Sequence, residues 1–486
     1  MTMRNLVCDT IVVGGGTAGL EAFRAASEAG TDCILVDAGR LGTTAQRSGE
    51  LPASYLMSAG LAAHASRTFD RYGLSVPEFE IEASGVLSMV RAQRSRATSS
   101  VLSFLYRIPE EKRLRGMVSF TDAHTARVGE DVTVSFKTAV IATGTAPLVT
   151  YEQSQIKNII TTNEFYEQER IPGSAAVFGS TSVGLQLGQA MAYLGSDVTV
   201  FGQRRLWNLT DEEVLSSALE MLSSRFSLAV DSFITSIDPE DDGYSIYYMD
   251  GGRFENYLHT SEVIAATART PNVGGMNLQH IGVKLSPEGY VVTDEATMQS
   301  SLPNIFAAGS VRGSTSTSIA ELEGRYAGLN ASRNVSERKA LAQLPTTVNL
   351  EVCYTDPVLA IAGLSFEKMK ERASAEGKPF IATHAEFSDI VSGGRHHRGG
   401  MIGLYTDVET HCIKGAEICS QCADHLAQLI AFAIKKQTKV EELPEFDFLH
   451  MSGEEVLSRV ASEAVSRLTG SGSYTPLLQP QSGSHV

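Results

Sequence analysis

The fold is predicted first from the stretch Asp9-Thr-Ile-Val-Val-Gly-Gly-Gly-Thr-Ala-Gly19. Its short β-branched run ends in glycine, which is typical of a buried parallel strand. A helix is expected from Ala18 to about Ala29, and a second strand from Cys33 to Asp37. The glycines between the first strand and the helix match G-x-G-x-x-G, so the stretch predicts a dinucleotide-binding βαβ unit of the Rossmann type.

Each residue of this motif has its own physical task. Gly14 permits a tight turn, Gly16 lets the backbone approach a pyrophosphate, and Gly19 lets the helix pack on the strand. The helix N-terminus faces the phosphate charge. Asp37 ends the second strand, where an acid binds a ribose hydroxyl pair. Because all these parts are in register, dinucleotide binding is favoured over a structural glycine turn.

A second unit repeats the plan with an altered glycine pattern. Residues 175–184 read as a strand and the start of a helix, but Thr181 replaces the middle glycine. Its Cβ and hydroxyl would push a pyrophosphate away from the backbone. The next strand, Asp197–Phe201, leads to Gln203 rather than to an acid, and Arg204-Arg205 is either a 2′-phosphate site or a pair of solvated arginines. NAD(P)H binding is therefore doubtful.

Composition narrows the classes of partner. The 486-residue chain is too long for one core, and its 43% apolar and 20% charged content is ordinary for globular folds. No apolar run approaches the ~20 residues of a membrane helix. The formal charge of −16 argues against nucleic acid and anionic lipid, which leaves small molecules. A strand-like run begins already at Thr10, so no leader is expected and a cytoplasmic location is predicted.

The six cysteines are too few for a disulfide scaffold. Four of them stand alone in apolar or strand-like contexts and are predicted to be inert: Cys8, Cys33, Cys353 and Cys412. Cys419 and Cys422 have the spacing of a redox or metal motif, but no second such pair completes a zinc site. Incidental cysteines are favoured, and no metal site is predicted.

Taken together, the chain resembles the flavin-dependent pyridine nucleotide–disulfide oxidoreductases, especially the dihydrolipoamide dehydrogenase and mercuric reductase group. The resemblance covers the chain to about Leu468 and implies FAD as cofactor and a homodimer. Its motifs are Gly14/Gly16/Gly19 with Asp37, Ala142-Thr-Gly144, Ala307-Ala-Gly-Ser310, Tyr354-Thr-Asp-Pro357 and His450-Met-Ser-Gly-Glu-Glu455.

The implied fold is α/β, with two Rossmann-like nucleotide-binding domains, one for FAD and one NAD(P)-like, and a C-terminal α+β dimerisation domain. The predicted segments are 1–150 (FAD-binding domain, first part), 151–272 (NAD(P)-binding-like domain), 273–345 (return segment of the FAD-binding domain), 346–468 (interface domain) and 469–486 (flexible tail).

The resemblance also implies the residues that bind FAD. They are Gly14, Gly16, Gly19, Asp37, Thr44, Thr143, Gly144, Gly309 and Ser310. Ser310 stands where the family has an aspartate that binds the flavin ribitol. A hydroxyl can still hydrogen-bond there, so FAD remains the expected cofactor.

The stretch Gly42-Thr-Thr-Ala-Gln-Arg-Ser-Gly-Glu-Leu-Pro-Ala-Ser-Tyr-Leu56 departs from the family. Ala45 and Glu50 match the two cysteines of its redox-active disulfide. The lysine that follows the disulfide is matched by Ser54, and its glutamate partner on the second unit by Gln186. Without the thiols the family's route of disulfide reduction is unavailable, so dihydrolipoamide dehydrogenase activity is not expected.

Two groups could still carry chemistry. Glu50 is expected in a partly apolar pocket that raises its pKa toward that of a working acid or base, although it could equally be a carboxylate that fills the vacated space. His450 with Glu455 matches the family's base and its orienting carboxylate, which act on the flavin of the other subunit. Met451 replaces the family's proline between them.

The leading hypothesis is an FAD-dependent oxidoreductase without a redox-active disulfide, which acts directly on a small molecule with the partner's His450–Glu455 dyad as base. One alternative is an NAD(P)H-dependent flavin reductase of quinones, metals or oxygen. Another is a non-catalytic flavoprotein or a dimeric binding or sensor protein. The sequence identifies neither the substrate nor a role for Cys419 and Cys422.

Overall fold

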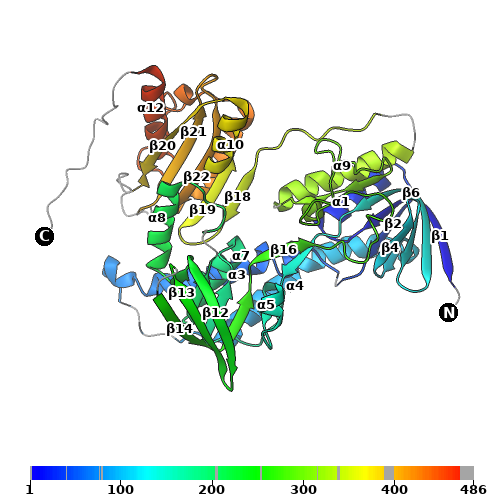
Figure 1. Cartoon of the computed structure of the whole chain (residues 1–486), viewed down its shortest axis with the longest axis horizontal. Coiled ribbons are helices and arrows are strands. Elements are labelled where there is room, and N and C mark those ends of the chain that lie inside the picture. The colour runs from blue at the N-terminus through cyan, green and yellow to red at the C-terminus, as the bar shows by residue number, and fades with distance from the viewer. Residues whose placement is uncertain are drawn as a thin grey trace.

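The computed structural model describes residues 3–39, 41–75, 77, 80–202, 206–251, 254–314, 316–335, 340–387 and 399–470. Two units are built on largely parallel sheets, and a C-terminal unit is built on an antiparallel sheet (Figure 1). The predicted α/β class with Rossmann-like sheets is confirmed. The predicted domain bounds stay a prediction, and Gln203, Arg204-Arg205 and tail residues 471–486 lie outside the described residues.

The first sheet has the strand order β3-β2-β1-β6-β5-β4, with β17 beside β6. Its strands are β1 (Arg4–Val13), β2 (Cys33–Asp37), β3 (Arg113–Arg115), β4 (Val118–Asp122), β5 (Thr125–Val128), β6 (Val132–Ile141) and β17 (Ile305–Ala307). The predicted second strand has the expected bounds, whereas β1 begins before the predicted Asp9. β17 pairs in parallel with β6, with Ile305 opposite Ala139, so the chain returns to this sheet.

Helices cover one face of this sheet. α1 (Thr17–Glu28) and α9 (Thr317–Val335) lie together over the strands (Figure 1). Buried side chains of the sheet, such as Val12 and Phe306, pack against Ala22 of α1 and Ala331 of α9. This burial of apolar area fixes the strand ends that carry the glycine turns.

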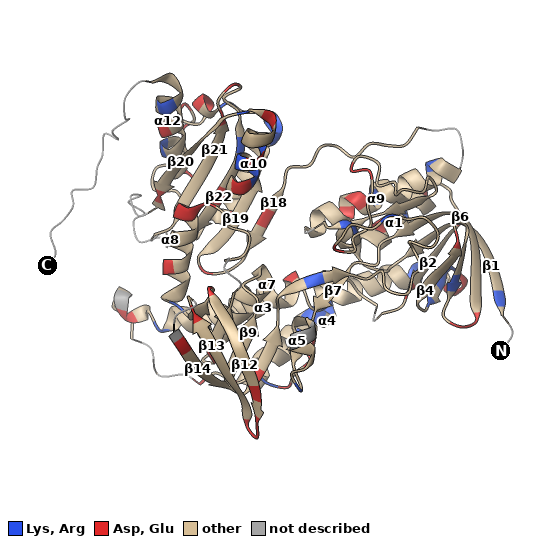
Figure 2. Cartoon of the chain, in the orientation of Figure 1, with Lys and Arg blue, Asp and Glu red and all other residues tan. Residues whose placement is uncertain are grey.

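The second unit has an all-parallel sheet in the order β11-β10-β9-β15-β8. Its elements are β8 (Ile160–Thr161), β9 (Ser174–Phe178), α7 (Ser182–Tyr193), β10 (Asp197–Phe201), α8 (Glu212–Ser223), β11 (Ser227–Ala229) and β15 (Glu262–Ala265). An antiparallel sheet of β12 (Ser232–Glu240), β13 (Gly243–Asp250) and β14 (Phe254–Thr260) projects from it, with acidic residues at the β12–β13 turn (Figure 2). β16 (Ala268–Pro271) pairs with β7 (Thr145–Leu148) and links this unit back to the first.

The C-terminal unit has an antiparallel sheet in the order β18-β19-β22-β21-β20. Its elements are β18 (Leu350–Cys353), β19 (Val358–Gly363), α10 (Phe366–Glu376), β20 (Phe380–Glu386), β21 (Met401–Asp407), β22 (Ile413–Ser420), α11 (Ala423–Lys436) and α12 (Glu455–Thr469). The predicted helix from Ala423 is confirmed. Among the described helices, none combines the length and the apolar character required to cross a bilayer.

Three helices outside the sheets complete the frame: α2 (Thr44–Arg47), α3 (Glu50–Ser66) and α4 (Ala83–Arg107). The three units meet at Tyr193 of α7. Its ring stacks on His64 of α3 with centroids 4.1 Å apart, and its hydroxyl donates to Asp356 Oδ2 over 2.7 Å. Asp356 also pairs with Arg225. These contacts tie α3 to both other units.

Candidate functional site

The carboxyl ends of β1, β6 and β17 meet at one edge of the first sheet. The turns that follow carry Gly14, Thr143, Gly144, Gly309 and Ser310. Gly14 has φ +111°, and a Cβ there would lie 2.2 Å from the carbonyl oxygen of Ala142, so only glycine fits between the two strands. Ligands of open α/β sheets bind outside such carboxyl ends. The structure therefore brings these predicted residues together.

The start of α1 is open to an anion. Gly16 is the N-cap and offers no side-chain cap, and a Cβ built on it would meet nothing within 4 Å. Asp37 accepts hydrogen bonds from the amides of Gly15 (2.5 Å) and Gly39 (2.7 Å). Free amide groups, the positive end of the helix dipole and open space are what a pyrophosphate requires.

One buried polar atom at this edge lacks a partner in the described structure, the hydroxyl Oγ1 of Thr143. Buried polar atoms in proteins are nearly always paired, and a ligand at this edge would supply a partner. With the open start of α1, the residues present at this edge fit a dinucleotide such as FAD.

The corresponding edge of the second sheet is different. Thr181 is the N-cap of α7, and its Oγ1 accepts from the Gly184 amide over 3.2 Å and donates to the Ala266 carbonyl over 2.7 Å. The side chain thus takes a helix amide that a phosphate would otherwise bind. Thr181 therefore opposes a bound phosphate in two ways. Its side chain fills space, and its hydroxyl caps the helix.

The stretch from Gly42 to Leu56 forms two helix starts. Thr43 caps α2 by accepting from the Gln46 amide over 3.3 Å, and Thr44 is the exposed first residue of that helix. Glu50 begins α3 and accepts from Thr317 Oγ1, at the start of α9, over 3.1 Å. Two helix N-termini favour a carboxylate between them.

Glu50 differs in one respect from the sequence-based expectation. A partly apolar pocket was expected, but Glu50 is exposed to solvent. The reason is positional: α3 and α9 both begin at the surface, so the carboxylate meets a hydroxyl and solvent rather than an apolar wall.

His450 and Glu455 of the C-terminal unit lie next to each other. His450 Nδ1 lies 3.2 Å from Glu455 Oε1, and the Met451 amide donates to Glu455 Oε2 over 3.0 Å. His450 is 69% exposed. Glu455 begins α12, in the unit that lies at the opposite end of Figure 1 from β1 and β2. Within one chain the structure does not bring the dyad to the edge of the first sheet.

Glu323 is a site residue that the sequence reasoning missed. It is 2% exposed, pairs with Arg312, and accepts from the Gly309 amide over 2.8 Å and from Ser314 Oγ. This buried carboxylate holds the return turn after β17. The sequence feature that could have indicated it is an acidic residue among the small residues on one face of the helix that follows the turn.

The two closely spaced cysteines lie at the end of β22 and at the N-cap of α11. Both are free thiols, and burial raises the pKa of Cys419 to about 12. Cys422 Sγ lies 3.4 Å from Ser420 Oγ. No group of three or more metal-ligating side chains occurs among the described residues. A structural role for the pair agrees with this geometry.

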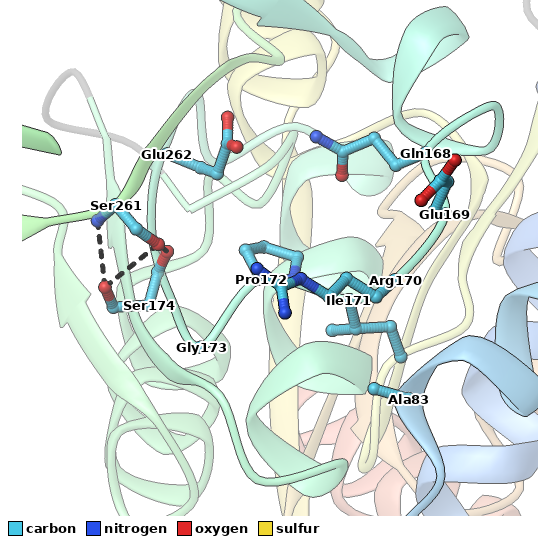
Figure 3. Close-up of a pocket in the computed structure, with 10 residues that line it drawn as sticks. All are labelled: Ala83, Gln168, Glu169, Arg170, Ile171, Pro172, Gly173, Ser174, Ser261 and Glu262. Atoms are coloured by element: carbon cyan, nitrogen blue, oxygen red, sulfur yellow. Dashed lines mark hydrogen bonds between the residues drawn. The ribbon is translucent and has the colours of Figure 1, made fainter. Parts of the chain in front are cut away.

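A hollow of about 950 Å³ lies at the other edge of the second sheet (Figure 3). Ser174 and Glu262, the first residues of β9 and β15, line it with Gln168 and Arg170. Ser174 and Ser261 are joined there by three hydrogen bonds of 2.9, 2.7 and 3.3 Å. Nucleotides bind at the carboxyl ends of parallel strands, whereas this hollow opens at their amino ends, so it is a different kind of site.

Comparison with known proteins gives consistent relatives. Residues 8–329 match the family model described as pyridine nucleotide-disulphide oxidoreductase. The chain is 26% identical to a mercuric reductase of Lysinibacillus sphaericus over 445 residues, which cover 90% of this chain and 79% of that protein. It is 25% identical to a dihydrolipoyl dehydrogenase of Geobacillus stearothermophilus over 476 residues, which cover 95% and 96%.

A solved structure shares the fold. The HOCl-induced flavoprotein disulfide reductase RclA of Escherichia coli, determined as the Cu(II) complex of a cysteine-to-serine mutant, superposes with a TM-score of 0.77 at 16% identity. The match covers 95% of this chain and 99% of that chain.

Proposed function

The chain belongs to the pyridine nucleotide-disulphide oxidoreductase family, and from this premise we propose that it oxidises a small molecule directly with FAD, without a disulfide or a nicotinamide. As a member of this family it is a flavin-dependent oxidoreductase, and its cofactor is FAD. The finer parts of the proposal concern the substrate, the base and the electron donor.

The proposed FAD site is the edge of the first sheet. Gly16 lets the pyrophosphate approach the start of α1, Gly14 and Gly19 allow the turn and the helix packing that form this start, and Asp37 accepts from the ribose. Thr44, Thr143, Gly144, Gly309 and Ser310 complete the proposed contacts. When bound, FAD supplies an acceptor for two electrons and a proton, taken together as a hydride.

His450 of the second subunit is the proposed base. Glu455 fixes the imidazole by its contact with Nδ1, which leaves Nε2 to take a proton from the substrate. A carboxylate beside the ring also stabilises the charged imidazolium that results. Glu50, exposed beside Thr317, is proposed to contact the substrate on the opposite side.

This assignment requires a homodimer. His450 is surrounded in sequence by exposed apolar side chains, with Phe446 64%, Leu449 75% and Met451 39% exposed. Phe432 of α11 is 60% exposed. Apolar surface in this amount favours burial against a second copy of the C-terminal unit. The dyad would then reach the partner's FAD.

The observation that carries the proposal is the difference between the two helix starts. α1 begins at the open Gly16, whereas α7 begins at Thr181, whose hydroxyl already caps the helix. This supports FAD binding at the first edge and opposes NAD(P)H at the second. The stretch 42–56 contains no cysteine, which also opposes passage of electrons through sulfur.

The proposal is tested with the purified holoprotein under anaerobic conditions. We expect the spectrum of bound FAD, no bleaching by NADH or NADPH, and bleaching by the substrate class found by screening alcohols, amines and hydroxy acids. His450→Ala should slow that bleaching about 100-fold, because a positioned base contributes about 10² to 10⁴ in rate.

His425→Ala is the matched control, since His425 is an exposed histidine of the same unit, on α11. Rapid bleaching by NADH or NADPH would replace this proposal with a nicotinamide-dependent flavin reductase. A purified protein without flavin would contradict it outright.

A further inference from the structure

The turn after β6 is held by the strand through which the chain leaves the second unit. Arg269 lies on β16, which pairs with β7 directly after the Thr143–Thr145 turn. Its Nε donates to Thr145 Oγ1 over 2.8 Å and its Nη2 to the Thr145 carbonyl over 2.7 Å. The guanidinium therefore donates to both the hydroxyl and the carbonyl oxygen of Thr145.

Asn272, one residue beyond β16, makes two further hydrogen bonds to the same turn. Its backbone amide donates to the Gly144 carbonyl over 2.9 Å, and its Nδ2 donates to the Thr143 carbonyl over 3.0 Å. The backbone carbonyls of Thr143, Gly144 and Thr145 thus all accept hydrogen bonds from β16 or from the residue that follows it. Gly144 has φ +69°, a left-handed shape that these contacts hold in place.

The polar groups left over at this turn are hydroxyls. Thr143 Oγ1 is buried without a partner. Thr145 Oγ1, which accepts from Arg269, donates toward Ser310 Oγ over 3.5 Å. Ser310 Oγ then accepts from Thr145, so its own hydrogen is free to be donated to a ligand.

Arg269 also brings a positive charge to this edge. Among the described residues it forms no ion pair with a carboxylate, and burial lowers the pKa of its guanidinium. Two of its five N–H groups are used by Thr145. An uncompensated cation raises the local potential, which favours an anionic cofactor.

We propose that Arg269 and Asn272 are positioning residues for FAD, which shape the Thr143–Thr145 turn and, through Thr145, set the Ser310 hydroxyl as a donor to the cofactor. This inference rests on the proposed placement of FAD at the first sheet. It gives the exit strand of the second unit a role in binding the cofactor of the first unit, so the two units are linked even without a bound nicotinamide.

The test measures FAD affinity by reconstitution of apoprotein with FAD, followed by flavin fluorescence. Arg269→Met should raise the Kd for FAD about tenfold or more, and Arg269→Lys, which keeps the charge but loses the fork, should give a smaller rise. Thr145→Val and Ser310→Ala should each raise the Kd about fivefold. The double variant should stay near fivefold rather than reach about 25-fold, since coupled residues are not additive.

Controls separate positioning from general stability. Arg127→Met and Thr121→Val change exposed residues of β5 and β4 in the same sheet and should leave the Kd unchanged. The melting temperature of each apoprotein is measured in parallel. A merely structural role would lower that temperature and leave the Kd of the folded fraction as in the wild type.

Two results overturn the inference. One is an unchanged Kd for FAD in both Arg269→Met and Thr145→Val. The other is full additivity of Thr145→Val and Ser310→Ala. If Arg269→Met does not fold, the Kd of Thr145→Val for FAD alone decides whether the inference holds, because this variant retains the carbonyl that Arg269 binds. Absence of FAD from the wild-type protein would instead contradict the proposed function, so the two failures are distinguishable.

Discussion

The backbone amide of Met451 donates to Oε2 of Glu455 over 3.0 Å, and the other oxygen of that carboxylate faces His450. Met451 has φ +65°, in the left-handed region. Proline has no amide hydrogen and is fixed near φ −65°. A proline therefore cannot be accommodated in this backbone, and the Met451 amide holds one oxygen of Glu455 in place.

Met451→Pro should slow substrate-dependent flavin reduction at least about tenfold, because Glu455 loses one anchor and His450 its fixed orientation. Stopped-flow absorbance at the flavin band measures the rate. Met451→Gly keeps the amide and tolerates a positive φ, so it should remain within about twofold of wild type. A Met451→Pro enzyme at the wild-type rate would show that the dyad is not the base.

Because Thr181 caps the start of α7, replacing this residue is expected to strengthen the binding of NADH. Thr181→Gly removes the Cβ and the hydroxyl, which frees the Gly184 amide for a phosphate. We expect its Kd for NADH to fall at least about tenfold relative to wild type by calorimetry. Thr181→Ser keeps a capping hydroxyl and should bind as poorly as wild type. Equal binding by all three proteins would mean that another feature excludes the nucleotide.

The turn and the helix start after β1 were predictable from the sequence because their signals are local. A β-branched strand, three glycines and a terminal acid lie within Asp9–Asp37, and their spacing alone specifies the turn and the helix start. The contact of His450 with Glu455 was also predictable, since the two residues are five positions apart. Their contact needs only a turn and the first residue of a helix.

The supporting contacts were not predictable in the same way. Arg269 and Thr145 are 124 residues apart, and their meeting depends on the pairing of β16 with β7. The exposure of Glu50 depends on where α9 begins, 267 residues away at Thr317. No local pattern encodes such distances, because they are set by the packing of whole units.

A contact between the second and C-terminal units should make stability depend on pH. His384 Nε2 lies 2.8 Å from Asp211 Oδ2, the N-cap of α8, and Tyr405 donates to the same oxygen over 3.0 Å. Burial opposes the charged form of His384, but Asp211, with Glu213 and Glu463 adding to it, outweighs burial and raises the histidine's pKa.

Asp211 is affected in the opposite direction. Burial opposes its charged form too, but His384 and Tyr405 donate to it, and its pKa is lowered. Tyr405 is held neutral by burial and by Glu417 and Asp211, which raise its pKa well above the usual value. The stabilisation from the pair is therefore fully present between about pH 4, the ordinary aspartate value, and about pH 6.5, the ordinary histidine value.

Stability from this pair should be lost as the pH rises through the raised pKa of His384, and also as the pH falls through the lowered pKa of Asp211. His384→Gln should remove about 1.5 to 3 kcal/mol of unfolding free energy near pH 6 and much less near pH 9. Urea unfolding at the two pH values measures this. His259→Gln, on β14 of the antiparallel sheet β12-β13-β14, is the control. An equal loss at both pH values would contradict the assignment.

Glu50 can be separated into its two possible roles by a pair of substitutions. Glu50→Gln keeps an acceptor for Thr317 but removes the negative charge, whereas Thr317→Val keeps the charge and removes the hydrogen bond. If Glu50 acts on the substrate, Glu50→Gln should lower kcat/KM about 100-fold and Thr317→Val less than about fivefold. If Glu50 only fills space at the start of α3, Glu50→Gln should be nearly silent. We expect the first pattern, with the spectrum of bound FAD unchanged in both variants, because an exposed carboxylate between two helix starts has its remaining lone pairs free for a ligand.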